Sequence, residues 1–440
     1  MKLLVLASYY PNDGHPFSGP FTERNAITLK NLCDSVEVLA PRPFVPPLLS
    51  SLKPRWQAYT KIPQQEIRNG LSVYRPAYLE LPRFGTAFWR DRGVFFASRE
   101  TARAMHKRVG FNAIVSFDLF GAGGLAWRLG HDLGIPASGW AYGSDLAQPP
   151  STPRERVVIR ALQRLDLVFY QSFELLDTAA GLLGLSPDQM QQDKHMVLAH
   201  GIPEPPVLPK EQTRKQIRST LGITNEQIVV MNFGRVVREK GIFELLEAMA
   251  LANQKDPRIA CVIIGSNPSF DETPAVQKTL NANPYLCERV KFLPACRPDQ
   301  TWEYLCAADI FVFPSHQRFE GMPNSLQEAM VMGVPAVAFA SRPVLELEGG
   351  TGLLLHVPPF DTIRLADAIL QLAASPRERA RLGALGKARV LEHFMVKKNI
   401  ARAYQRLCQM VEQHTTQQNR SRPLESHHDR ASLTPVRSQV

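Results

Sequence analysis

The sequence predicts an α/β protein made of two doubly wound, Rossmann-like domains. The chain has 440 residues, which is more than one ordinary hydrophobic core accommodates. Short apolar runs typical of buried strands alternate with helical patterns in both halves, and such repeating units form parallel sheets covered by helices on both faces. Between the halves, the run GIPEPPVLP at Gly201–Pro209 is the best candidate for a linker.

In the first half, the turn Ser18-Gly19-Pro20 predicts the start of a helix covering about Phe21–Cys33, and a second helix is expected near Val94–Val109. The Pro-rich stretch Pro41–Pro63 is expected to leave the sheet. The first apolar run is too short for a signal peptide, so we expect a strand there. The expected strands are Leu3–Ser8, Val36–Leu39, Ala113–Phe117, Pro136–Trp140, Leu167–Tyr170 and Met196–Leu198.

The second half repeats this scheme. A helix from about Ile242 places its apolar residues on one face, and helices are expected again from Gly352–Leu355 to about Val411. Residues 413–440 are polar and show no apolar period, which predicts a disordered tail. The expected strands are Ile228–Phe233, Ala260–Ile264, Val290–Leu293, Asp309–Phe313 and Pro335–Phe339.

Two carboxylates flank a predicted helix start within Asp309–Phe339. Asn324 is expected to cap the helix, and Gln327 to complete a capping box. Glu320 then lies in the loop before the helix, and Glu328 lies one turn inside it. A helix start favours a phosphate, whereas carboxylates on either side suit the hydroxyls of a sugar or a ribose. The alternative is a solvated loop acid and an exposed helix acid.

Two cations are expected at the same edge of the sheet. Gly234-Arg235 directly follows one predicted strand, and Lys240-Gly241 precedes the next helix. Ligands of open parallel sheets bind beyond the carboxyl ends of the strands, so these residues should meet Glu320–Asn324. Arg235 and Lys240 would supply two positive charges suited to a diphosphate. The alternative is a pair of exposed cations near helix starts.

Composition limits the class of protein and its surroundings. The six cysteines form no C-x-x-C pair, which argues against a disulfide framework or a zinc site and is typical of the reducing cytosol. No stretch approaches the roughly 20 apolar residues that span a bilayer. The net charge of +10 is concentrated in Arg42–Arg108, where 13 Lys or Arg face 4 Asp or Glu, a local charge of +9. Interleaved aromatic residues make nucleic acid, an anionic membrane or a polyanionic acceptor suitable partners, and a solvated face over core aromatics is the alternative.

One motif points to another class of enzyme. The run GAGGLA at Gly121–Ala126 follows a predicted strand and has the G-x-G-x-x-A spacing of dinucleotide sites, with Asp145 24 residues beyond Gly121. A dinucleotide-dependent oxidoreductase is therefore one alternative. The motif lies in the middle of the strand order, however, and it leaves the second half of the chain unexplained.

Two longer motifs carry a family resemblance. GRVVREKG at Gly234–Gly241 and FEGMPNSLQEAMVMGVPAVAF at Phe319–Phe339 resemble the retaining glycosyltransferases of group 1, also called family 4, which have the GT-B fold of two domains facing a cleft. The first half, with YYPNDGHPFSGPFTERNAITL, is similar to the subset that builds exopolysaccharide or teichuronic-type polymers. The resemblance implies an acceptor-side domain at 1–203, a nucleotide-sugar domain at 210–390, and a helix at 391–412 that packs back on the first domain.

The resemblance also implies roles for individual residues. Arg235 and Lys240 would hold the nucleotide diphosphate, Glu328 the ribose, and Glu320 the transferred sugar. Gly19 would approach the diphosphate from across the cleft. The other donor-binding residues would be Gly234, Gly321, Met322, Pro323, Asn324 and Ser325. The family needs no divalent metal and no cofactor beyond the substrate, a UDP- or GDP-linked sugar.

The acceptor side departs from the family pattern. Asp118 stands where many relatives have a histidine near the reacting carbon, and Tyr142-Gly143-Ser144-Asp145 replaces an H-G-S-D-like turn. His200 replaces a linker asparagine. Asp118 could position the acceptor hydroxyl or take its proton, or it could cap a helix. Tyr142 and Asp145 are expected on the acceptor side, with ordinary turn packing as the alternative.

The expected function is retaining transfer of a hexose from a nucleotide diphosphate sugar to a glycan, with Glu320, Lys240, Arg235 and Asp118 as catalytic residues. The acceptor is expected to be lipid-linked and to belong to cell-surface polysaccharide biosynthesis. Arg42–Arg108 would hold the protein at the inner face of the plasma membrane, and nucleic acid is not expected as a partner. The alternatives are a sucrose-, trehalose- or starch-type synthase with a soluble acceptor, or a non-catalytic binding protein that keeps the fold.

Overall fold

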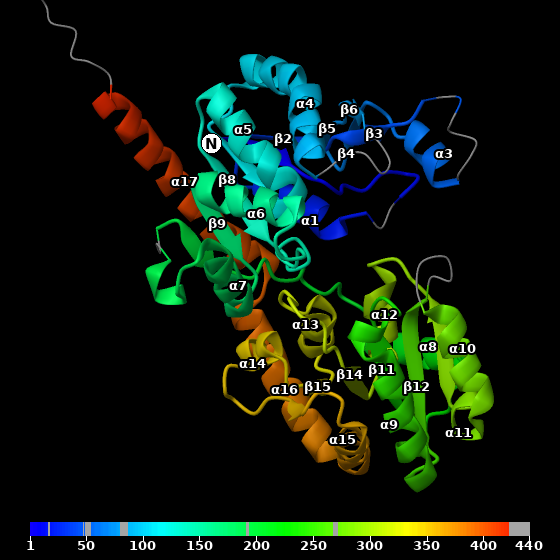
Figure 1. Ribbon diagram of the computed structural model, residues 1–440. Helices are drawn as coiled ribbons and strands as arrows, with labels where there is room; N and C mark the ends of the chain where they lie inside the picture. Colours follow the sequence, from blue (N-terminus) through cyan, green and yellow to red (C-terminus); the bar gives the residue numbers. More distant parts are fainter. Residues whose placement is uncertain are drawn as a thin grey trace, which may run out of the picture.

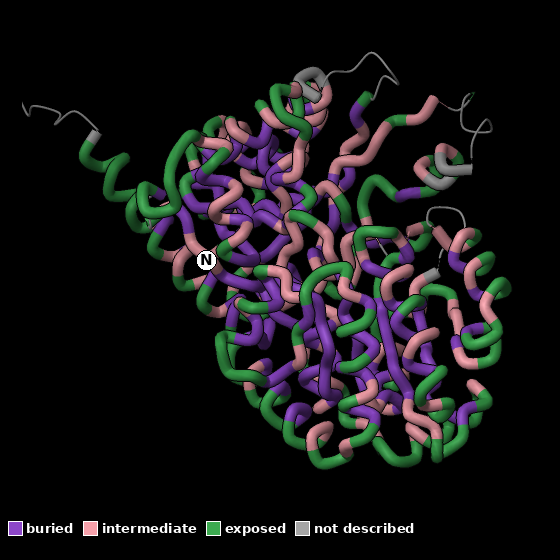
Figure 2. The backbone as a smooth tube through the Cα atoms, turned by 60° about the horizontal axis from the view of Figure 1, so that its bottom comes forward, coloured by how far each residue is buried: buried purple, intermediate pink, exposed green. Residues whose placement is uncertain are grey.

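Two separate parallel sheets divide the protein into two halves, with the helices packed around them (Figure 1). The structure is a computed structural model that describes residues 1–15, 18–46, 48, 54–79, 87–190, 193–266 and 272–421. The predicted fold class is confirmed, because each sheet is built from strands joined through helices. Figure 2 shows the buried backbone running through the middle of each half, with exposed residues on the outside.

The first sheet has the strand order β10-β9-β8-β7-β1-β2-β5-β4, and its pairs are parallel except for β4 with β5. The chain builds outward from β1 to β2 and then reverses to β7 on the other side of β1, so the strand order switches direction there. The strands are β1 (Lys2–Leu6), β2 (Ser35–Leu39), β4 (Gln65–Arg68), β5 (Leu71–Tyr74), β7 (Ala113–Ser116), β8 (Ala137–Ala141), β9 (Leu167–Tyr170) and β10 (His195–Val197).

Helices cover both faces of this sheet and bury apolar clusters against it. Helices α4, α5, α6 and α7 cover one face, and α1 covers the other. The helical elements are α1 (Pro20–Lys30), α3 (Pro54–Thr60), α4 (Ala87–Val109), the π-helical turn η1 (Leu119–Gly123), α5 (Gly124–Leu133), α6 (Pro153–Arg164), α7 (Phe173–Leu183) and the 3-10 turn η2 (Pro187–Gln189).

The chain after β2 contains structure that the sequence analysis did not predict. Strand β3 (Arg42–Phe44) pairs with β6 (Ala77–Leu79) in a small parallel sheet, so the stretch from Pro41 does leave the main sheet. Strands β4 and β5 then return to the main sheet as an antiparallel hairpin. Its turn is Asn69-Gly70, whose φ angles of 49° and 74° match the two-residue turns that favour Asn-Gly.

The second sheet is parallel throughout, in the order β13-β12-β11-β14-β15-β16. Apolar clusters lie on both of its faces. The strands are β11 (Ile228–Phe233), β12 (Ile259–Ser266), β13 (Val290–Pro294), β14 (Ile310–Phe313), β15 (Ala336–Phe339) and β16 (Leu355–Val357). The helical elements are α8 (Lys210–Thr220), η3 (Arg238–Lys240), α9 (Ile242–Lys255), α10 (Thr273–Ala282), α11 (Pro284–Cys287), α12 (Gln300–Ala307), α13 (Asn324–Val331), α14 (Arg342–Glu348), α15 (Thr362–Ala374), α16 (Pro376–His393) and α17 (Val396–Ser421).

The two connections between the halves lie side by side. Ile202 N–H donates to Phe394 O at 2.8 Å, and Val396 N–H donates to Ile202 O at 2.8 Å. Gly201 has φ +81°, and a Cβ there would lie 2.4 Å from Phe394 O, so a larger residue would separate the two crossings. The second crossing leads into α17, whose apolar face packs on the first half beside α1 (Figure 1).

The prediction that disorder begins at residue 413 is wrong for residues 413–421, which continue helix α17. The apolar period ends there, but the backbone hydrogen bonds of a helix do not require it. Gln418 Nε2 also donates to Gly134 O at 3.1 Å, which attaches the polar end of the helix to the first half. The rest of the predicted tail, residues 422–440, lies outside the described residues.

Candidate active site

Lys240 and Glu320 meet at the carboxyl edge of the second sheet. Lys240 Nζ lies 2.5 Å from Glu320 Oε2, and Ser315 Oγ donates to the same carboxylate oxygen at 3.0 Å. Lys240 ends the η3 turn after β11, and Glu320 lies in the loop that joins β14 to α13. The structure therefore brings together two residues that are 80 positions apart, as the strand pattern predicted.

Gly241 allows this approach. Its φ is +72°, and a Cβ would lie 1.9 Å from Pro314 O, so the loop after β11 is pressed against the loop after β14. Only glycine tolerates both the angle and the contact. The close approach of the two loops places Lys240 beside Glu320.

Gly234 and Arg235 are exposed at the end of β11. A Cβ built on Gly234 would meet no atom within 4 Å, so open space lies in front of the strand end. On its other side, a Cβ on Gly265 would lie 1.9 Å from Gly234 O. Gly265 therefore packs against one side of Gly234, and the other side is open. The open side leaves room for a ligand beside Arg235.

The start of α13 differs from the prediction. The N-cap is Pro323, and Asn324 is the first residue of the helix, with no side-chain cap. The predicted capping box is wrong, because the helix begins one residue early and turns Gln327 into the core, where it is fully buried. The first N–H groups of α13 consequently have no side-chain cap. Ser325 lies in this first turn, while Met322 and Pro323 are buried beneath it.

Glu328 faces the first half across a cleft of about 680 Å³. The opposite wall is formed by α1, including Phe21 and Arg24. Burial raises the pKa of Glu328 to about 7, although the Arg24 guanidinium lowers it. Arg24 Nη2 donates to Gly201 O at 3.0 Å, so the guanidinium is held at the junction of the halves.

Sequence analysis missed Arg24. Its significance depends on Glu328, which lies 304 residues further along the chain. Local patterns around α1 give no sign of that partner.

Gly19 begins α1 with φ +72°. A Cβ there would lie 2.4 Å from Tyr9 O, in its own half of the molecule. The loop after β1 and the start of α1 are therefore in close contact, and this contact requires a glycine at position 19. The contact fixes the start of the helix that carries Phe21 and Arg24.

Asp118 caps the π-helical turn η1. Its Oδ1 accepts from Gly121 N and Ala122 N at 2.6 and 2.8 Å, and its Oδ2 accepts from Ser8 N at 3.2 Å. This is the helix-cap alternative, and it occupies the carboxylate with backbone N–H groups. The geometry gives no sign of the free carboxylate that a catalytic role for Asp118 would need.

Asp145 also binds backbone groups. It accepts from Leu119 N at 2.9 Å, Gly143 N at 2.8 Å and Tyr142 N at 3.1 Å. Burial raises its pKa to about 6, against the effect of these hydrogen bonds. Asp145 therefore fixes the turn after β8 and does not present its oxygens to a ligand.

The turn that Asp145 shapes touches the loop that carries Glu320. A Cβ on Gly143 would lie 2.2 Å from Phe319 O, and a Cβ on Gly321 would lie 2.7 Å from Tyr142 O. Phe319 has φ +59°, an uncommon angle for a bulky residue, and its ring packs on the core of the first half. The residue directly before Glu320 is thus anchored on the opposite half.

Tyr142 and His200 lie together at this junction. The Tyr142 hydroxyl accepts from Asn25 Nδ2 at 3.0 Å, and the Tyr142 and His200 rings have centroids 5.5 Å apart. Burial raises the pKa of Tyr142 and holds that of His200 well below its usual range, so both are neutral near pH 7. They act as packing groups between the halves.

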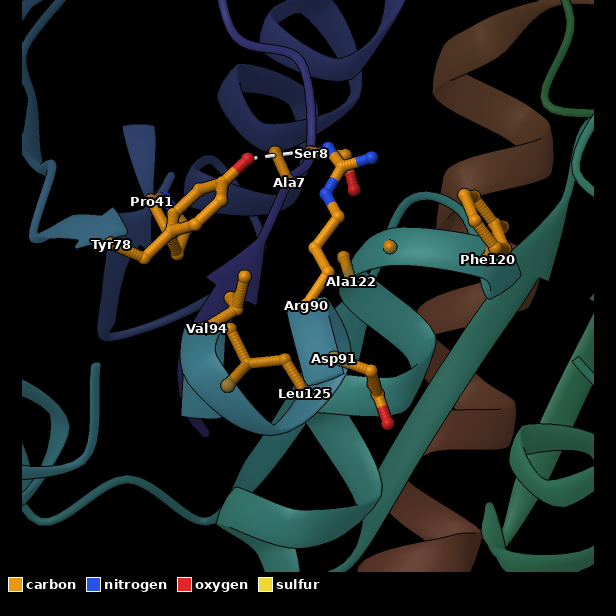
Figure 3. Close-up of a pocket in the computed structure, with 11 residues that line it drawn as sticks. Ala7, Ser8, Pro41, Tyr78, Arg90, Asp91, Val94, Phe120, Ala122 and Leu125 are labelled. Carbon is orange, nitrogen blue, oxygen red and sulfur yellow. Dashed lines mark hydrogen bonds between the residues drawn. The ribbon is translucent and has the colours of Figure 1, made fainter. Parts of the chain in front are cut away.

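The GAGGLA run does not form a dinucleotide site. It belongs to η1 and the start of α5, where a Cβ on Gly121 would lie 1.9 Å from Ser8 Oγ and one on Gly124 would lie 2.1 Å from Asp91 Oδ1. The glycines therefore admit neighbouring side chains, and Asp145 is occupied with backbone. Figure 3 shows the small pocket that these residues border.

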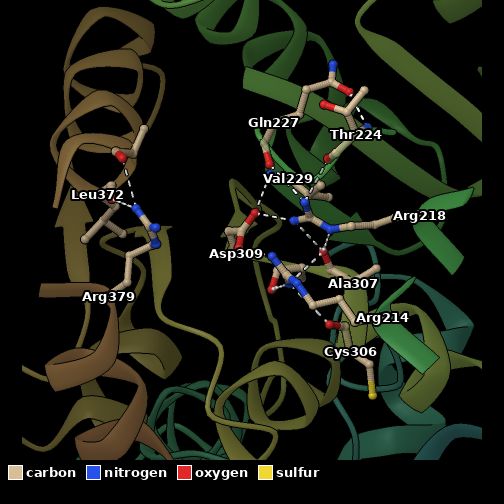
Figure 4. A network of polar contacts seen from close by, with 12 residues as sticks. Arg214, Arg218, Thr224, Gln227, Val229, Cys306, Ala307, Asp309, Leu372 and Arg379 are labelled. Atoms are coloured by element: carbon tan, nitrogen blue, oxygen red, sulfur yellow. Dashed lines mark hydrogen bonds and ion pairs between the residues drawn. The ribbon is translucent and has the colours of Figure 1, made fainter. Parts of the chain in front are cut away.

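A charged network lies at the other edge of the second sheet, away from this site (Figure 4). Asp309 accepts from Arg214 at 2.6 Å, from Arg218 at 2.5 Å and from Val229 N at 2.8 Å. Arg214 and Arg218 also donate to the last carbonyls of α12. Because Asp309 directly precedes β14 and binds Val229 of β11, the network fixes the amino ends of these central strands.

Within the described part of the chain, no group of three or more His, Cys, Asp or Glu side chains is placed to hold a metal ion. Among the same residues, no helix combines the length and hydropathy needed to cross a bilayer.

The fold and the site define a class. Two Rossmann-like halves face a cleft whose walls include Asn324 and Glu328 of α13. The carboxyl edge of the second sheet, where α13 starts, also carries the Lys240–Glu320 ion pair and the exposed Arg235. This is the GT-B fold of glycosyltransferases. Solved structures share it over nearly the whole chain: sucrose-phosphate synthase from Thermosynechococcus elongatus (TM-score 0.70, 20% identity, 94% of this chain and 100% of that one) and Anabaena Alr3699/HepE in complex with UDP and glucose (TM-score 0.69, 18% identity, 93% and 100%).

Sequence comparison gives the family. A model described as glycosyl transferases group 1 matches residues 213–389. TuaC of Bacillus subtilis (strain 168), whose name assigns it to teichuronic acid biosynthesis, is 30% identical over 372 residues, 84% of this chain and 88% of TuaC. A GDP-mannose-dependent phosphatidylinositol monomannoside mannosyltransferase of Mycolicibacterium smegmatis is 25% identical over 360 residues, 79% of this chain and 86% of the relative. The chain belongs to the group 1 glycosyl transferases.

Proposed function

We propose that the protein is a retaining glycosyltransferase of family 4 that moves a hexose from a UDP- or GDP-linked sugar to a glycan acceptor. The observation that carries this proposal is the Lys240–Glu320 pair beside the uncapped start of α13, with Arg235 exposed at the same edge. Cations and free N–H groups suit a diphosphate, and a neighbouring carboxylate suits sugar hydroxyls.

The charge that develops on the leaving diphosphate determines the chemistry. Lys240, Arg235 and the first N–H groups of α13 stabilise this charge, which is the largest catalytic contribution available at the site. With the donor bound, Lys240 turns from Glu320 to the phosphate, and Glu320 accepts hydrogen bonds from the sugar. Glu328 accepts hydrogen bonds from the ribose.

The transfer itself involves one bond broken and one bond formed. The bond between the anomeric carbon and the diphosphate oxygen breaks, and the acceptor oxygen bonds to the same face of that carbon. The acceptor proton passes to a phosphate oxygen of the leaving group. Because Lys240 and Arg235 neutralise the diphosphate, we expect turnover without a divalent metal, measurable as activity that survives EDTA.

The curated relatives support a glycan or lipid-linked glycan as acceptor. TuaC is named for teichuronic acid biosynthesis, and the mannosyltransferase is named for phosphatidylinositol monomannoside. The sucrose-phosphate synthase likeness, at 20% identity, is one of fold alone and does not favour a soluble acceptor.

We also propose that Arg42–Arg108 contacts the membrane that carries the acceptor. Five large apolar side chains among the described residues of this basic segment are exposed, namely Phe44 at 46%, Leu48 at 90%, Ile67 at 79%, Leu79 at 60% and Phe96 at 67%. Basic residues with exposed apolar side chains suit an anionic lipid surface. The protein should co-sediment with vesicles containing phosphatidylglycerol and not with pure phosphatidylcholine, and Phe96→Ser with Leu79→Ser should weaken this binding.

The donor assignment is tested by transfer assays on Lys240→Ala and Glu320→Ala. Both variants should lose turnover, whereas Lys255→Ala on α9 should not, because Lys255 pairs with Asp367 on the protein surface. Unchanged turnover in Lys240→Ala and Glu320→Ala would remove the site assignment. If the wild type binds a nucleotide but shows no transfer activity with any nucleotide sugar, the result would favour the non-catalytic alternative.

A further inference from the structure

A small pocket lies at the carboxyl edge of the first sheet (Figure 3). Its walls are Ala7 and Ser8 after β1, the start of α4, and residues 120–122 of η1. Its volume is about 40 Å³. A cavity needs roughly 10–15 Å³ on this measure to hold one water, so only a group of a few atoms fits. The pocket can take one substituent of a sugar, such as a carboxylate or a phosphate, and not a whole ring.

The glycine run gives the pocket its shape. Ser8 Oγ would clash with any side chain at position 121, because a Cβ there would lie 1.9 Å away. Asp91 Oδ1 lies 2.1 Å from where a Cβ on Gly124 would be. The GAGGLA run suggested a dinucleotide site. Its glycines instead let the Ser8 hydroxyl and the Asp91 carboxylate approach the backbone of η1 and α5.

Positive charge surrounds the pocket. The Arg90 side chain reaches from α4 toward Ser8, and its Nη2 donates to the Tyr78 hydroxyl at 3.2 Å (Figure 3). Arg154 lies over the Phe120 ring, 5.8 Å from its centroid. Further arginines lie close enough to Asp91 to lower the pKa of its carboxyl, although burial raises it overall; they are Arg92, Arg128 and Arg160.

Negative charge is scarce there. Asp91 is the sole carboxylate among the described residues that line the pocket. Its Oδ2 lies 2.5 Å from Arg128 Nη2, and its Oδ1 is buried without a hydrogen-bond partner among the described residues. Glu155, beside Arg154, accepts a hydrogen bond from Ser151 N at 2.7 Å. Among the described residues around the pocket, arginines therefore outnumber carboxylates.

The position of Arg90 supports a binding role. Arg90 lies in the first turn of α4, which carries no acidic residue. A cation there opposes the helix dipole. The guanidinium places a positive charge beside a cavity whose size admits a small oxyanion.

Contacts connect the pocket to the donor loop. Gly321, next to Glu320, packs against Tyr142 O. The turn at Tyr142 is fixed by Asp145, which also binds Leu119 N of η1. Asp118, which caps η1, binds Ser8 N in the pocket wall. The pocket therefore lies on the acceptor side of the same junction.

We propose that this pocket binds an anionic substituent of the acceptor through Arg90, and that the enzyme thereby selects acidic glycans. The inference rests on the proposed function and adds the chemical class of the acceptor. The oxyanion is a sugar carboxylate or a phosphate, which have the same requirement for a planar cation and a small polar cavity.

Binding of matched probes tests the inference. Methyl α-D-glucuronide and methyl α-D-glucoside differ in one carboxylate, and glucose 6-phosphate provides the phosphate. Each probe is titrated in the presence of UDP or GDP, and its binding is followed by saturation-transfer NMR. We expect one anionic probe to bind at least tenfold more tightly than the glucoside, and its identity distinguishes carboxylate from phosphate. Arg90→Gln should remove this preference, and Arg90→Lys should restore part of it.

Lys107→Gln provides the control, because it removes the same charge from an exposed position on the same helix. Equal binding of charged and neutral probes, or a preference that survives Arg90→Gln, would overturn the inference. Thermal stabilisation by UDP or GDP in each variant shows that it is folded and that the donor site is intact. If no nucleotide binds to the wild type, the proposed function itself fails, and the two failures are thereby distinguished.

Discussion

The carboxyl edges of the two sheets use similar residues in opposite ways. In the second half, Lys240 and Glu320 bind each other beside open space at Gly234. In the first half, Asp118 and Asp145 are occupied by backbone N–H groups. A charged residue at a strand end is therefore a candidate for chemistry only if its partners can be exchanged for a ligand. The donor edge meets this condition, and the two acceptor-side carboxylates do not.

The largest difference between the edges should appear in catalysis. Lys240→Ala should lower kcat by about 10²- to 10³-fold, because it removes one cation from the leaving diphosphate. Asp118→Asn should keep most of the activity per folded molecule, since its carboxylate caps a helix. Steady-state kinetics on folded protein measure both. A loss in Asp118→Asn as large as that in Lys240→Ala would restore the catalytic hypothesis for Asp118.

Stability should show the reverse order. Asp145→Ala leaves three buried N–H groups without acceptors, and we expect it to lower the free energy of unfolding by about 2–4 kcal/mol. Glu320→Ala removes an exchangeable partner of Lys240 and should cost less than about 1 kcal/mol. Urea unfolding measures both values. Similar losses in the two variants would mean that Glu320 is as structural as Asp145.

The pH dependence of donor binding tests Glu328. Its pKa of about 7 in the free protein means that ribose hydroxyls bind best once the carboxyl has lost its proton. Nucleotide affinity should therefore rise by up to about tenfold from pH 6 to pH 8, and Glu328→Gln should abolish this rise. Because the folded pKa is raised, the stability contribution of Glu328 is present below about pH 4.5 and is lost as the pH rises toward 7. Calorimetric titrations at several pH values give the affinities, and a rise retained in Glu328→Gln would contradict the role.

The smallest expected effect concerns a contact between the halves away from the cleft. Glu346 on α14 accepts from Phe173 N and Glu174 N at the start of α7, and Arg342 pairs with Asp177. Glu346→Gln should weaken this contact by about 0.5–1 kcal/mol in thermal unfolding, because a neutral amide accepts more weakly from a helix start. Donor affinity should stay within about twofold. A tenfold change in affinity would show that this contact controls the opening of the cleft.

The sequence predicted which residues meet at the edge of the second sheet better than it predicted the contacts of Asp118 and Arg24, for a physical reason. Gly234, Lys240 and Glu320 follow strands whose order can be inferred from local patterns, and the edge of a parallel sheet then brings them together. The state of Asp118 depends on Ser8 N, 110 residues away, and Arg24 depends on Glu328 in the other half. Local patterns contain no information on such partners.

Two errors were local, and only one was avoidable. Asn69-Gly70 is a strong hairpin signal that was present in the sequence and not used. The cap of α13 could not be inferred in the same way, because Asn324 is a good capping residue and yet it is the first residue of the helix, with Pro323 as the N-cap. The polar residues after Gln413 also stay helical. A hydrogen bond from Gln418 to Gly134 in the first half supports them, and their own sequence pattern gives no sign of this contact.

The most direct test of the account is thermal stabilisation by UDP, GDP, ADP and NAD, measured on the wild type and on Lys240→Ala. The account predicts that UDP or GDP raises the midpoint of unfolding in the wild type and that the shift disappears in Lys240→Ala. Stabilisation by NAD alone, or a nucleotide shift that is unchanged in Lys240→Ala, would contradict the placement of the donor at the edge of the second sheet.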